Sequence, residues 1–232
     1  MNTHQQANIR DLERLYANRF SDAERAAKSR LWKVLCGSFL SRYVPQNATV
    51  LDLGAGYCDF LNNIQALRKI AIDLNPDTGK YAGPGVEVYL LPLEQLGNAA
   101  APNTVDVAFA SNVFEHLRGP ESLLEILAAV YLALKPGGVL MILQPNVRRV
   151  GMAFWDFVDH TLPLTEKGMA EALSMTGFTI VENRARFLPY TTKSRTPKSE
   201  FLLRAYLWFR PIQWVLGKQM FLVARKPSKS TS

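Results

Sequence analysis

The sequence predicts an α/β fold built on a mostly parallel sheet with helices on both faces. Short apolar segments alternate with helical patterns from residue 49 to residue 143, as in parallel-sheet proteins. The first apolar segment runs directly into two glycines, a common feature at the carboxyl end of a parallel strand. The chain has 232 residues, of which 48% are hydrophobic, which is enough for one domain with a sizeable core.

Seven segments have the apolar, β-branched character of strands. The segment over 105–110 is apolar on both faces, as expected for a strand at the centre of a sheet. In chain order, the predicted strands are Thr49–Leu53, Lys69–Asp73, Val86–Leu90, Val105–Ala110, Val139–Leu143, Phe178–Phe187 and Gln219–Arg225. The regular alternation with helices ends after the fifth of them.

Helical periodicity fills the intervals between these strands. The first helical part is expected to break at Ser21 or Asp22, since either residue can cap a helix. The predicted helical segments are Ile9–Tyr43, Tyr57–Leu67, Pro120–Leu134 and the helix from a Thr165 cap to Gly177. Residues 135–138, Lys-Pro-Gly-Gly, predict a turn, because proline fixes φ at one position and glycine allows a positive φ at the next.

Charge is distributed unevenly along the chain. The net charge is +7. The segment 184–232 carries eleven Lys or Arg and one acid, so the basic character belongs to the C-terminal part and suits an anionic partner. Cys36 and Cys58 lie in apolar surroundings, which favours buried thiols. No export signal or membrane span is recognisable, and a cytoplasmic location is expected, with peripheral contact at a membrane as a further option.

The segment Val50-Leu-Asp-Leu-Gly-Ala-Gly56 is the main candidate for ligand binding. Its two glycines allow a sharp turn and a close approach of the backbone to a ligand. Dinucleotide-binding proteins use a similar turn, but the third glycine of their G-x-G-x-x-G pattern is replaced here by Asp59. Asp52 would repel a pyrophosphate and would suit a water or an ammonium group. Asp73, which ends the second strand, can accept hydrogen bonds from both hydroxyls of a ribose.

These motifs resemble those of class I S-adenosylmethionine-dependent methyltransferases. VLDLGAG and IDLNPD look like their cofactor-binding half, the segment 105–117 looks like their fourth strand and its turn, and LKPGGVLMILQPN looks like their fifth strand. FEHL and KPGG are similar to sequences of the small-molecule branch. The resemblance covers residues 45–226. It implies a Rossmann-like, seven-stranded, mostly parallel sheet with a C-terminal antiparallel strand, and S-adenosylmethionine as the cofactor, with S-adenosylhomocysteine as its product.

The resemblance also implies which residues contact the cofactor. They are Tyr16 and Arg19 on a helix that closes over the site, Asp52, Gly54, Ala55 and Gly56 at the methionine part, Asp73 at the ribose, Leu74, Leu91 and Pro92 at the adenine, and Ser111, Asn112 and Val113 under the sulfonium and amino acid group. Many relatives place an aspartate beside the adenine, where this chain has none. A backbone contact or Glu94 could replace it.

A base is expected beside the acceptor, since an oxygen nucleophile must lose its proton. His160 is the candidate, because it follows the fifth strand, where the family builds its acceptor site. Asp156 lies four residues earlier and could orient the His160 ring if the segment is helical. The alternative is that His160 only holds the loop through a backbone hydrogen bond. His116 is expected to be structural or cofactor-adjacent, and no metal is expected.

The expected function is methyl transfer to a small or a lipid- or sugar-linked acceptor, at oxygen. Nucleic acid is not the expected acceptor, because SNVFEHL at 111–117 lacks the proline-proline-aromatic run that grips an extruded base. The basic C-terminal segment keeps an RNA methyltransferase open as an alternative. Two further functions stay open on the same fold, a non-catalytic module that binds S-adenosylmethionine and an NAD(P) oxidoreductase.

The segment 201–218 is unusually rich in tryptophan, leucine and phenylalanine, with Arg204 and Arg210 between them and a break expected at Pro211. This composition suits a helix in a membrane interface, a lid over an apolar acceptor, a homodimer contact, or a helix packed on the sheet. The expected organisation is an N-terminal helical cap over 1–44, a methyltransferase domain over 45–226 with a helical insertion around 200–217, and a disordered tail over 227–232.

Overall fold

The computed structural model describes residues 22–190 and 199–228 of the chain. Its strands are β1 (Thr49–Leu53), β2 (Arg68–Asp73), β3 (Val86–Leu90), β4 (Val105–Ser111), β5 (Leu134–Pro145), β6 (Thr179–Arg184) and β7 (Gln219–Arg225). They form one seven-stranded sheet in the order β3-β2-β1-β4-β5-β7-β6. β1 to β5 are parallel, and β7 is antiparallel to both β5 and β6. The predicted fold class is confirmed.

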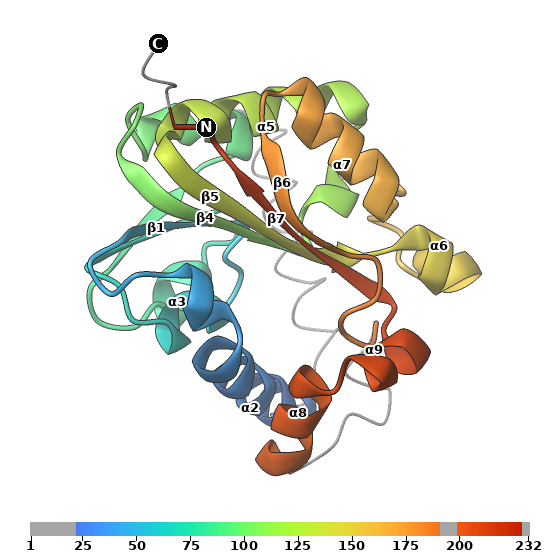
Figure 1. Ribbon diagram of the computed structural model, residues 1–232. Helices are drawn as coiled ribbons and strands as arrows, with labels where there is room; N and C mark the ends of the chain where they lie inside the picture. The colour runs from blue at the N-terminus through green and yellow to red at the C-terminus, as the bar shows by residue number, and fades with distance from the viewer. Residues whose placement is uncertain (1–21, 191–198, 229–232) are drawn as a thin grey trace.

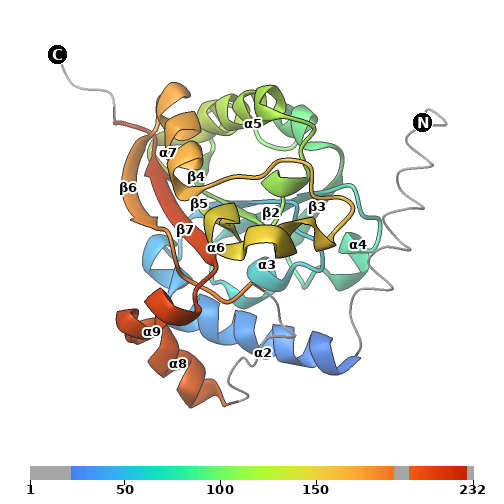
Figure 2. The same ribbon diagram turned by 90° about the vertical axis from the view of Figure 1, so that its right-hand side faces the viewer.

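Helices cover both faces of this sheet. The α-helices are α2 (Asp22–Ser38), α3 (Asp59–Asn63), α4 (Thr78–Tyr81), α5 (Pro120–Ala133), α6 (Val147–Val150), α7 (Glu166–Met175), α8 (Glu200–Trp208) and α9 (Arg210–Leu216). The 3-10 helices are η1 (Leu40–Tyr43), η2 (Leu93–Asn98), η3 (Phe114–His116) and η4 (Gly151–Asp156). Figure 1 shows α5 and α7 on one face and α2, α3 and α8 on the other. Figure 2 looks toward the carboxyl ends of the parallel strands, with α6 in front.

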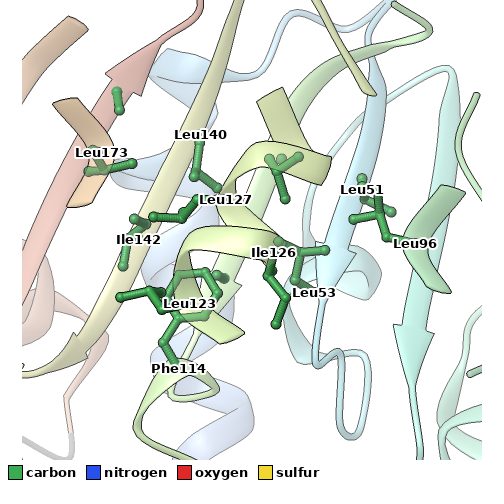
Figure 3. Close-up of a cluster of buried hydrophobic side chains, with 14 of the residues drawn as sticks. Leu51, Leu53, Leu96, Phe114, Leu123, Ile126, Leu127, Leu140, Ile142 and Leu173 are labelled. Atoms are coloured by element: carbon green, nitrogen blue, oxygen red, sulfur yellow. The ribbon is translucent and has the colours of Figure 1, made fainter. Parts of the chain in front are cut away.

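Two apolar cores result from the alternation of side chains along the strands. Leu51 and Leu53 of β1 face α5 and pack in a fully buried cluster with Ile126 and Leu127 (Figure 3). Val50, which points in the opposite direction, belongs to the second cluster, which α2 and α3 cover. Because β1 is buried on both faces, its carboxyl end is a rigid support for the loop that follows it.

The helix after β1 is shorter than the sequence predicts. Instead of spanning residues 57–67, α3 covers only Asp59–Asn63. Cys58 has a left-handed backbone with φ of 56°, which prevents an earlier start, and Ile64 is already extended. The side chain of Asn63 donates to the carbonyl oxygen of Asp59 at 2.8 Å, so it competes with the backbone for a helical acceptor.

The Lys-Pro-Gly-Gly segment lies inside β5, and not in a turn before it. The pairing of β4 with β5 shifts at this point, because Val105 pairs with Leu134 while Val107 pairs with Val139. Residues 135–138 are thus a bulge in the strand. Gly137 has the predicted positive φ, at 83°, and its N–H donates to the carbonyl oxygen of Lys226 at 2.8 Å. The local shape was predictable, but the start of the strand was not.

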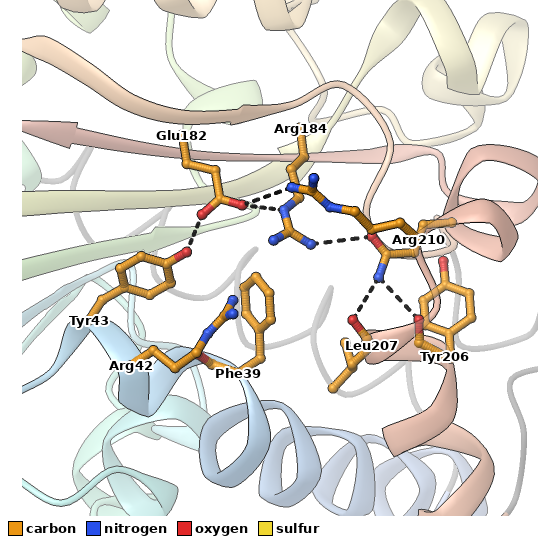
Figure 4. A network of polar contacts seen from close by, with 9 residues as sticks. Phe39, Arg42, Tyr43, Glu182, Arg184, Tyr206, Leu207 and Arg210 are labelled. Atoms are coloured by element: carbon orange, nitrogen blue, oxygen red, sulfur yellow. Dashed lines mark hydrogen bonds and ion pairs between the residues drawn. The ribbon is translucent and has the colours of Figure 1, made fainter.

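Glu182 of β6 joins the sheet to the N-terminal part of the chain. It accepts a hydrogen bond from the hydroxyl of Tyr43 in η1, and it forms ion pairs with Arg184 and, at 3.7 Å, with Arg210 of α9 (Figure 4). This half-buried network therefore ties together η1, β6 and the start of α9.

Gln213 fixes the angle between α8 and α9. Its buried side-chain nitrogen donates to the carbonyl oxygens of Tyr206 at 3.1 Å and Leu207 at 3.0 Å (Figure 4). These are carbonyls of the last turn of α8, which has no further helical donors for them. Pro211 lies in the first turn of α9, where its missing N–H costs nothing. The predicted break at this proline is confirmed as a bend between two helices.

Candidate functional site

The loop after β1 has an unusual backbone. Gly54 has a φ of 68° and Gly56 a φ of 53°. The N–H groups of Gly54 and Ala55 both donate to the carbonyl oxygen of Ile72 in β2, at 2.9 and 3.2 Å. The left-handed positions favour glycine, and the two hydrogen bonds fix the loop against the neighbouring strand.

The two glycines have different surroundings. A Cβ atom on Gly54 would lie 2.6 Å from Cγ2 of Val113, so the loop after β1 packs directly against the loop after β4. A Cβ atom on Gly56 would meet nothing within 4 Å. The backbone at Gly56 therefore borders open space, as a loop that approaches a ligand requires.

This difference gives a stability test. Gly54→Ala should lower the free energy of unfolding by about 2–5 kcal/mol, from backbone strain of about 1–2 kcal/mol and overpacking of about 1–3 kcal/mol. Gly56→Ala is the matched control and should lose only about 1–2 kcal/mol, the strain contribution. Urea denaturation of both variants measures the difference. Equal losses would contradict the close packing of Gly54 on Val113.

Asp73 connects this loop with the end of β2. Its Oδ2 accepts from the N–H of Gly56 at 2.6 Å, and its Oδ1 accepts from the N–H of Asn75 at 2.7 Å. Each oxygen keeps acceptor capacity for a hydroxyl group. Burial raises the pKa of the Asp73 carboxyl above its usual value, although backbone hydrogen bonds from Asn75, Gly56 and Leu74 oppose this.

Asp52 is a second carboxyl at the same edge, only 3% exposed. Its pKa lies well above the usual value, first because of burial and then because of the negative charges of Asp73 and Asp59. A cationic ligand nearby would stabilise the ionised form of Asp52. A pyrophosphate would instead add to the repulsion, so the pair of carboxyls favours a positively charged ligand.

The residues predicted at the adenine follow β2 and β3, which are neighbours in the sheet. Asp73 pairs with Leu90, so Leu74 and Leu91 leave adjacent strands at the same edge. Leu74 is exposed, while Leu91 and Pro92 are half-buried. Glu94 is exposed and lies 3.5 Å from the hydroxyl of Ser122 in α5.

The loop after β4 completes this edge of the sheet. Ser111 ends β4, and Asn112 has a left-handed backbone with φ of 50°. The N–H of Asn112 donates to the carbonyl oxygen of Leu143 in β5 at 2.9 Å, which holds the loop over the sheet. The carboxyl ends of β1 and β4 meet where the strand order reverses, the usual ligand site of open α/β sheets. Tyr16 and Arg19 lie outside the described residues.

A cluster of titratable side chains lies next to this loop. Glu115, His116 and His160 each place one ligand-type atom within 4.8 Å of the other two. Glu115 is 2% exposed and His160 is 8% exposed. The two imidazole ring centroids are 5.0 Å apart. We call these three residues the Glu–His–His cluster.

The surroundings of His160 differ from the helix that the sequence suggests. η4 ends at Asp156, and Phe157 is extended, so no helix continues from Asp156 to His160. The His160 ring stacks on Phe157 at a centroid distance of 4.9 Å and contacts Phe154 at 4.7 Å. It is Asp159, rather than Asp156, that lies against a histidine, with Oδ2 3.2 Å from Nδ1 of His116.

Glu115 and Gln144 are buried polar residues for which sequence reasoning finds no role. The amide group of Gln144, near the end of β5 and shortly before α6, has no hydrogen-bond partner among the residues that the structure describes. The sequence holds one signal for Glu115, its place beside a histidine directly after the fourth strand. No comparable signal marks Gln144, because its strand is otherwise an ordinary apolar one.

The family pattern described as "Methyltransferase domain" matches residues 23–183 of this chain. None of the curated proteins matches it closely enough to count as a relative. Among solved structures, an S-adenosylmethionine-dependent methyltransferase of Archaeoglobus fulgidus is 21% identical, with a TM-score of 0.66, and the match covers 91% of this chain and 98% of that one.

Two further structures have the same fold. One is a proposed Haloferax volcanii methyltransferase in complex with the Trm112 methyltransferase activator, 16% identical, with a TM-score of 0.65 and coverage of 88% of this chain and 94% of that one. The other is phosphoethanolamine N-methyltransferase 2 of Haemonchus contortus with phosphomonomethylethanolamine and S-adenosylhomocysteine. It is 17% identical, with a TM-score of 0.55 and coverage of 82% of this chain and 51% of that one.

Proposed function

The chain belongs to the methyltransferase-domain family, since the family pattern spans residues 23–183, and from this premise we propose that it transfers a methyl group from S-adenosylmethionine to an oxygen of a small acceptor. The observation that carries the proposal is the arrangement of Gly56 and Asp73. One carboxylate orders a glycine loop next to open space and keeps acceptor capacity for a ribose.

The residues at the sheet edge fit this cofactor. Asp73 would hold the ribose, Asp52 favours a positive charge, and the half-buried pair Leu91 and Pro92 offers an apolar contact for the adenine. Ser111, Asn112 and Val113 would lie under the methionine part. When bound, S-adenosylmethionine supplies a methyl group on a positively charged sulfur, which leaves as the neutral thioether of S-adenosylhomocysteine. The chain's own task is then mainly to position the acceptor and to exclude water.

The acceptor is proposed to bind at the Glu–His–His cluster. Val113 packs on Gly54, and Glu115 follows two residues later, so the cluster adjoins the cofactor loop. An oxygen acceptor must lose a proton, and the imidazole of His160 is a group that can assist. Trp155, nearby on η4, is exposed and offers an apolar wall for a small acceptor.

Release of S-adenosylhomocysteine tests this function. The purified chain, supplied with S-adenosylmethionine and a panel of phenols, sugars and lipid-linked hydroxyl compounds, should release S-adenosylhomocysteine with at least one hydroxyl acceptor. The same panel with amines in place of hydroxyls should give much less. Turnover on RNA alone would select a nucleic acid acceptor, and binding without turnover on any acceptor would select a non-catalytic module.

An apolar surface on α8 and α9 supports a further proposal, contact with a membrane surface. Leu203, Tyr206 and Leu207 are buried against the rest of the chain. The opposite side is apolar and exposed, with Phe201, Leu202, Trp208 (85% exposed), Phe209, Trp214 (74% exposed) and Val215. Exposed Arg204 and Lys218 add positive charge. Tryptophan beside cations suits the interface of an anionic bilayer. In the described part of the chain, no helix is long and apolar enough to cross a membrane.

Vesicle flotation measures this contact. The chain should float with vesicles of phosphatidylcholine and phosphatidylserine, and the double variant Trp208→Ser/Trp214→Ser should lose most of this binding, because two apolar anchors are removed. Trp155→Ser, an exposed tryptophan on η4, is the matched control and should float normally. If the chain does not float, and sedimentation instead shows a homodimer that the double variant dissociates, the partner of this surface is a second copy of the chain and not a membrane.

A further inference from the structure

The Glu–His–His cluster has the composition of a metal site. Its three potential ligand atoms, one carboxylate oxygen and two imidazole nitrogens, all lie within 4.8 Å of one another. Imidazole and carboxylate ligands suit divalent transition metals such as zinc. Glu115 and His160 are almost fully buried, whereas the His116 side chain is 30% exposed. The cluster is thus protected on one side and open on another.

Backbone contacts hold the two halves of the cluster in place. The N–H groups of Thr161 and Leu162 both donate to the carbonyl oxygen of Glu115, at 2.8 and 3.0 Å. The hydroxyl of Thr161 donates to the carbonyl oxygen of Leu117 at 2.6 Å. The segment that carries His160 is therefore fixed directly alongside the segment that carries Glu115. A metal site requires such preorganised ligands, because loosely held side chains lose entropy on binding.

A second carboxylate orients His116. Its Nδ1 lies 3.0 Å from the backbone oxygen of Asp159 and 3.2 Å from Oδ2 of the same residue. With two acceptors at Nδ1, that nitrogen carries the proton, and the lone pair is left on Nε2. A histidine that donates from one ring nitrogen to a carboxylate and binds through the other is the usual arrangement at metal centres. Asp159 thus has the position of an outer-shell partner.

We propose that Glu115, His116 and His160 bind one divalent transition metal ion, which receives the acceptor's hydroxyl oxygen. Three protein ligands leave coordination positions open for a water or a substrate. The acceptor class is a compound with an ionisable hydroxyl group. On binding to the ion, the O–H bond breaks, its proton passes to water, and the oxygen keeps the electron pair. In this arrangement His160 is a ligand and not the base. The inference rests on the proposed function for the acceptor, but not for the binding of the ion.

Metal binding is measured without any methyl transfer. The full chain without a histidine tag, stripped with a chelator, is dialysed against Zn²⁺ or Co²⁺ and its metal content determined. The wild type should retain about one equivalent, should melt at a higher temperature with the ion, and should give the visible absorption of Co²⁺ bound by nitrogen ligands. Glu115→Gln and His160→Gln should each lose the equivalent. His4→Ala, which removes the only other histidine, is the matched control and should retain it.

Asp159→Asn tests the positioning role and should weaken metal binding about 10–100-fold without abolishing it. A wild type that retains no ion, and whose melting temperature does not respond to Zn²⁺ or Co²⁺, overturns the inference, whatever the variants do. So does equal retention by the wild type and His160→Gln. Binding of S-adenosylmethionine, measured separately, distinguishes the two proposals. If the cofactor binds and the metal does not, only the metal site is refuted. If the metal binds and the cofactor does not, the metal site stands and the proposed methyl transfer is refuted.

Discussion

Replacing His160 by alanine is expected to lower turnover at saturating S-adenosylmethionine by about 100-fold or more, while the affinity for the cofactor stays unchanged. Removal of the acceptor's proton contributes ~10²–10⁴-fold to such reactions. His160→Ala removes this contribution whether the ring takes the proton itself or holds the ion that receives the acceptor oxygen. The His160 side chain belongs to the cluster after β4 and β5, whereas the cofactor loop is ordered by the hydrogen bond from Gly56 to Asp73. Initial rates and calorimetric titration measure the two quantities separately.

The control for this variant is His4→Ala, which should retain full turnover. A melting curve is also needed, because His160 stacks on Phe157 and its loss opens a small space beside Phe154. Full activity in a folded His160→Ala protein would mean that the ring only supports the loop. A loss of cofactor affinity as large as the loss of turnover would mean that the His160 ring contacts the cofactor and not the acceptor.

Asp73→Ala should weaken binding of S-adenosylmethionine by up to about 100-fold, or about 3 kcal/mol, because two hydrogen bonds to a charged acceptor are lost. It should also loosen the loop, since the N–H groups of Gly56 and Asn75 lose their acceptor. Asp77→Ala is the matched control. Asp77 lies four residues further on and pairs with exposed Lys80 at 2.5 Å, so affinity should be unchanged. Unchanged affinity in the Asp73 variant would refute the ribose assignment.

The sheet and the cofactor loop could be predicted because their signals are local. Val50, Leu51 and Leu53 are apolar, the glycines follow at once, and β1 has the predicted bounds. The helix after it could not be delimited in the same way, because its early start is prevented by the left-handed backbone of Cys58. The amino acid composition of a segment does not show which of its non-glycine residues takes a positive φ. The place of the Lys-Pro-Gly-Gly segment inside a strand was not predictable either. Its sequence is that of a turn, but its hydrogen-bond partner Lys226 lies far along the chain.

The Glu–His–His cluster could not be predicted, because it depends on long-range contact. Glu115 and His160 are 45 positions apart, and the hydrogen bonds from Thr161 and Leu162 bring them together. The sequence suggests each histidine separately, and it suggests Asp156 as the partner of His160, whereas the structure places Asp159 beside His116. A spacing of four residues places two side chains together only if the helix between them is continuous.

The exposed face of α8 and α9 is similarly ambiguous from the sequence. The composition of 201–218 suits burial and exposure equally well. The structure separates the two faces, since Tyr206 is buried, with its hydroxyl donating to the carbonyl oxygen of Phe187 at 2.6 Å, whereas Trp208 is exposed. Which residues of an apolar helix are covered depends on the partner that packs against it, and a partner of α8 here is α2, far away in the sequence.

Thermal melting with added ligands tests the central claim, that the loop after β1 and the carboxylate ending β2 hold an adenosyl sulfonium compound. A ligand that binds only the folded state raises the melting temperature, and the shift grows with its excess over Kd. S-adenosylmethionine and S-adenosylhomocysteine should each raise it at millimolar concentration, and NADH should not. No shift with either of the first two, or a shift with NADH alone, would contradict the account.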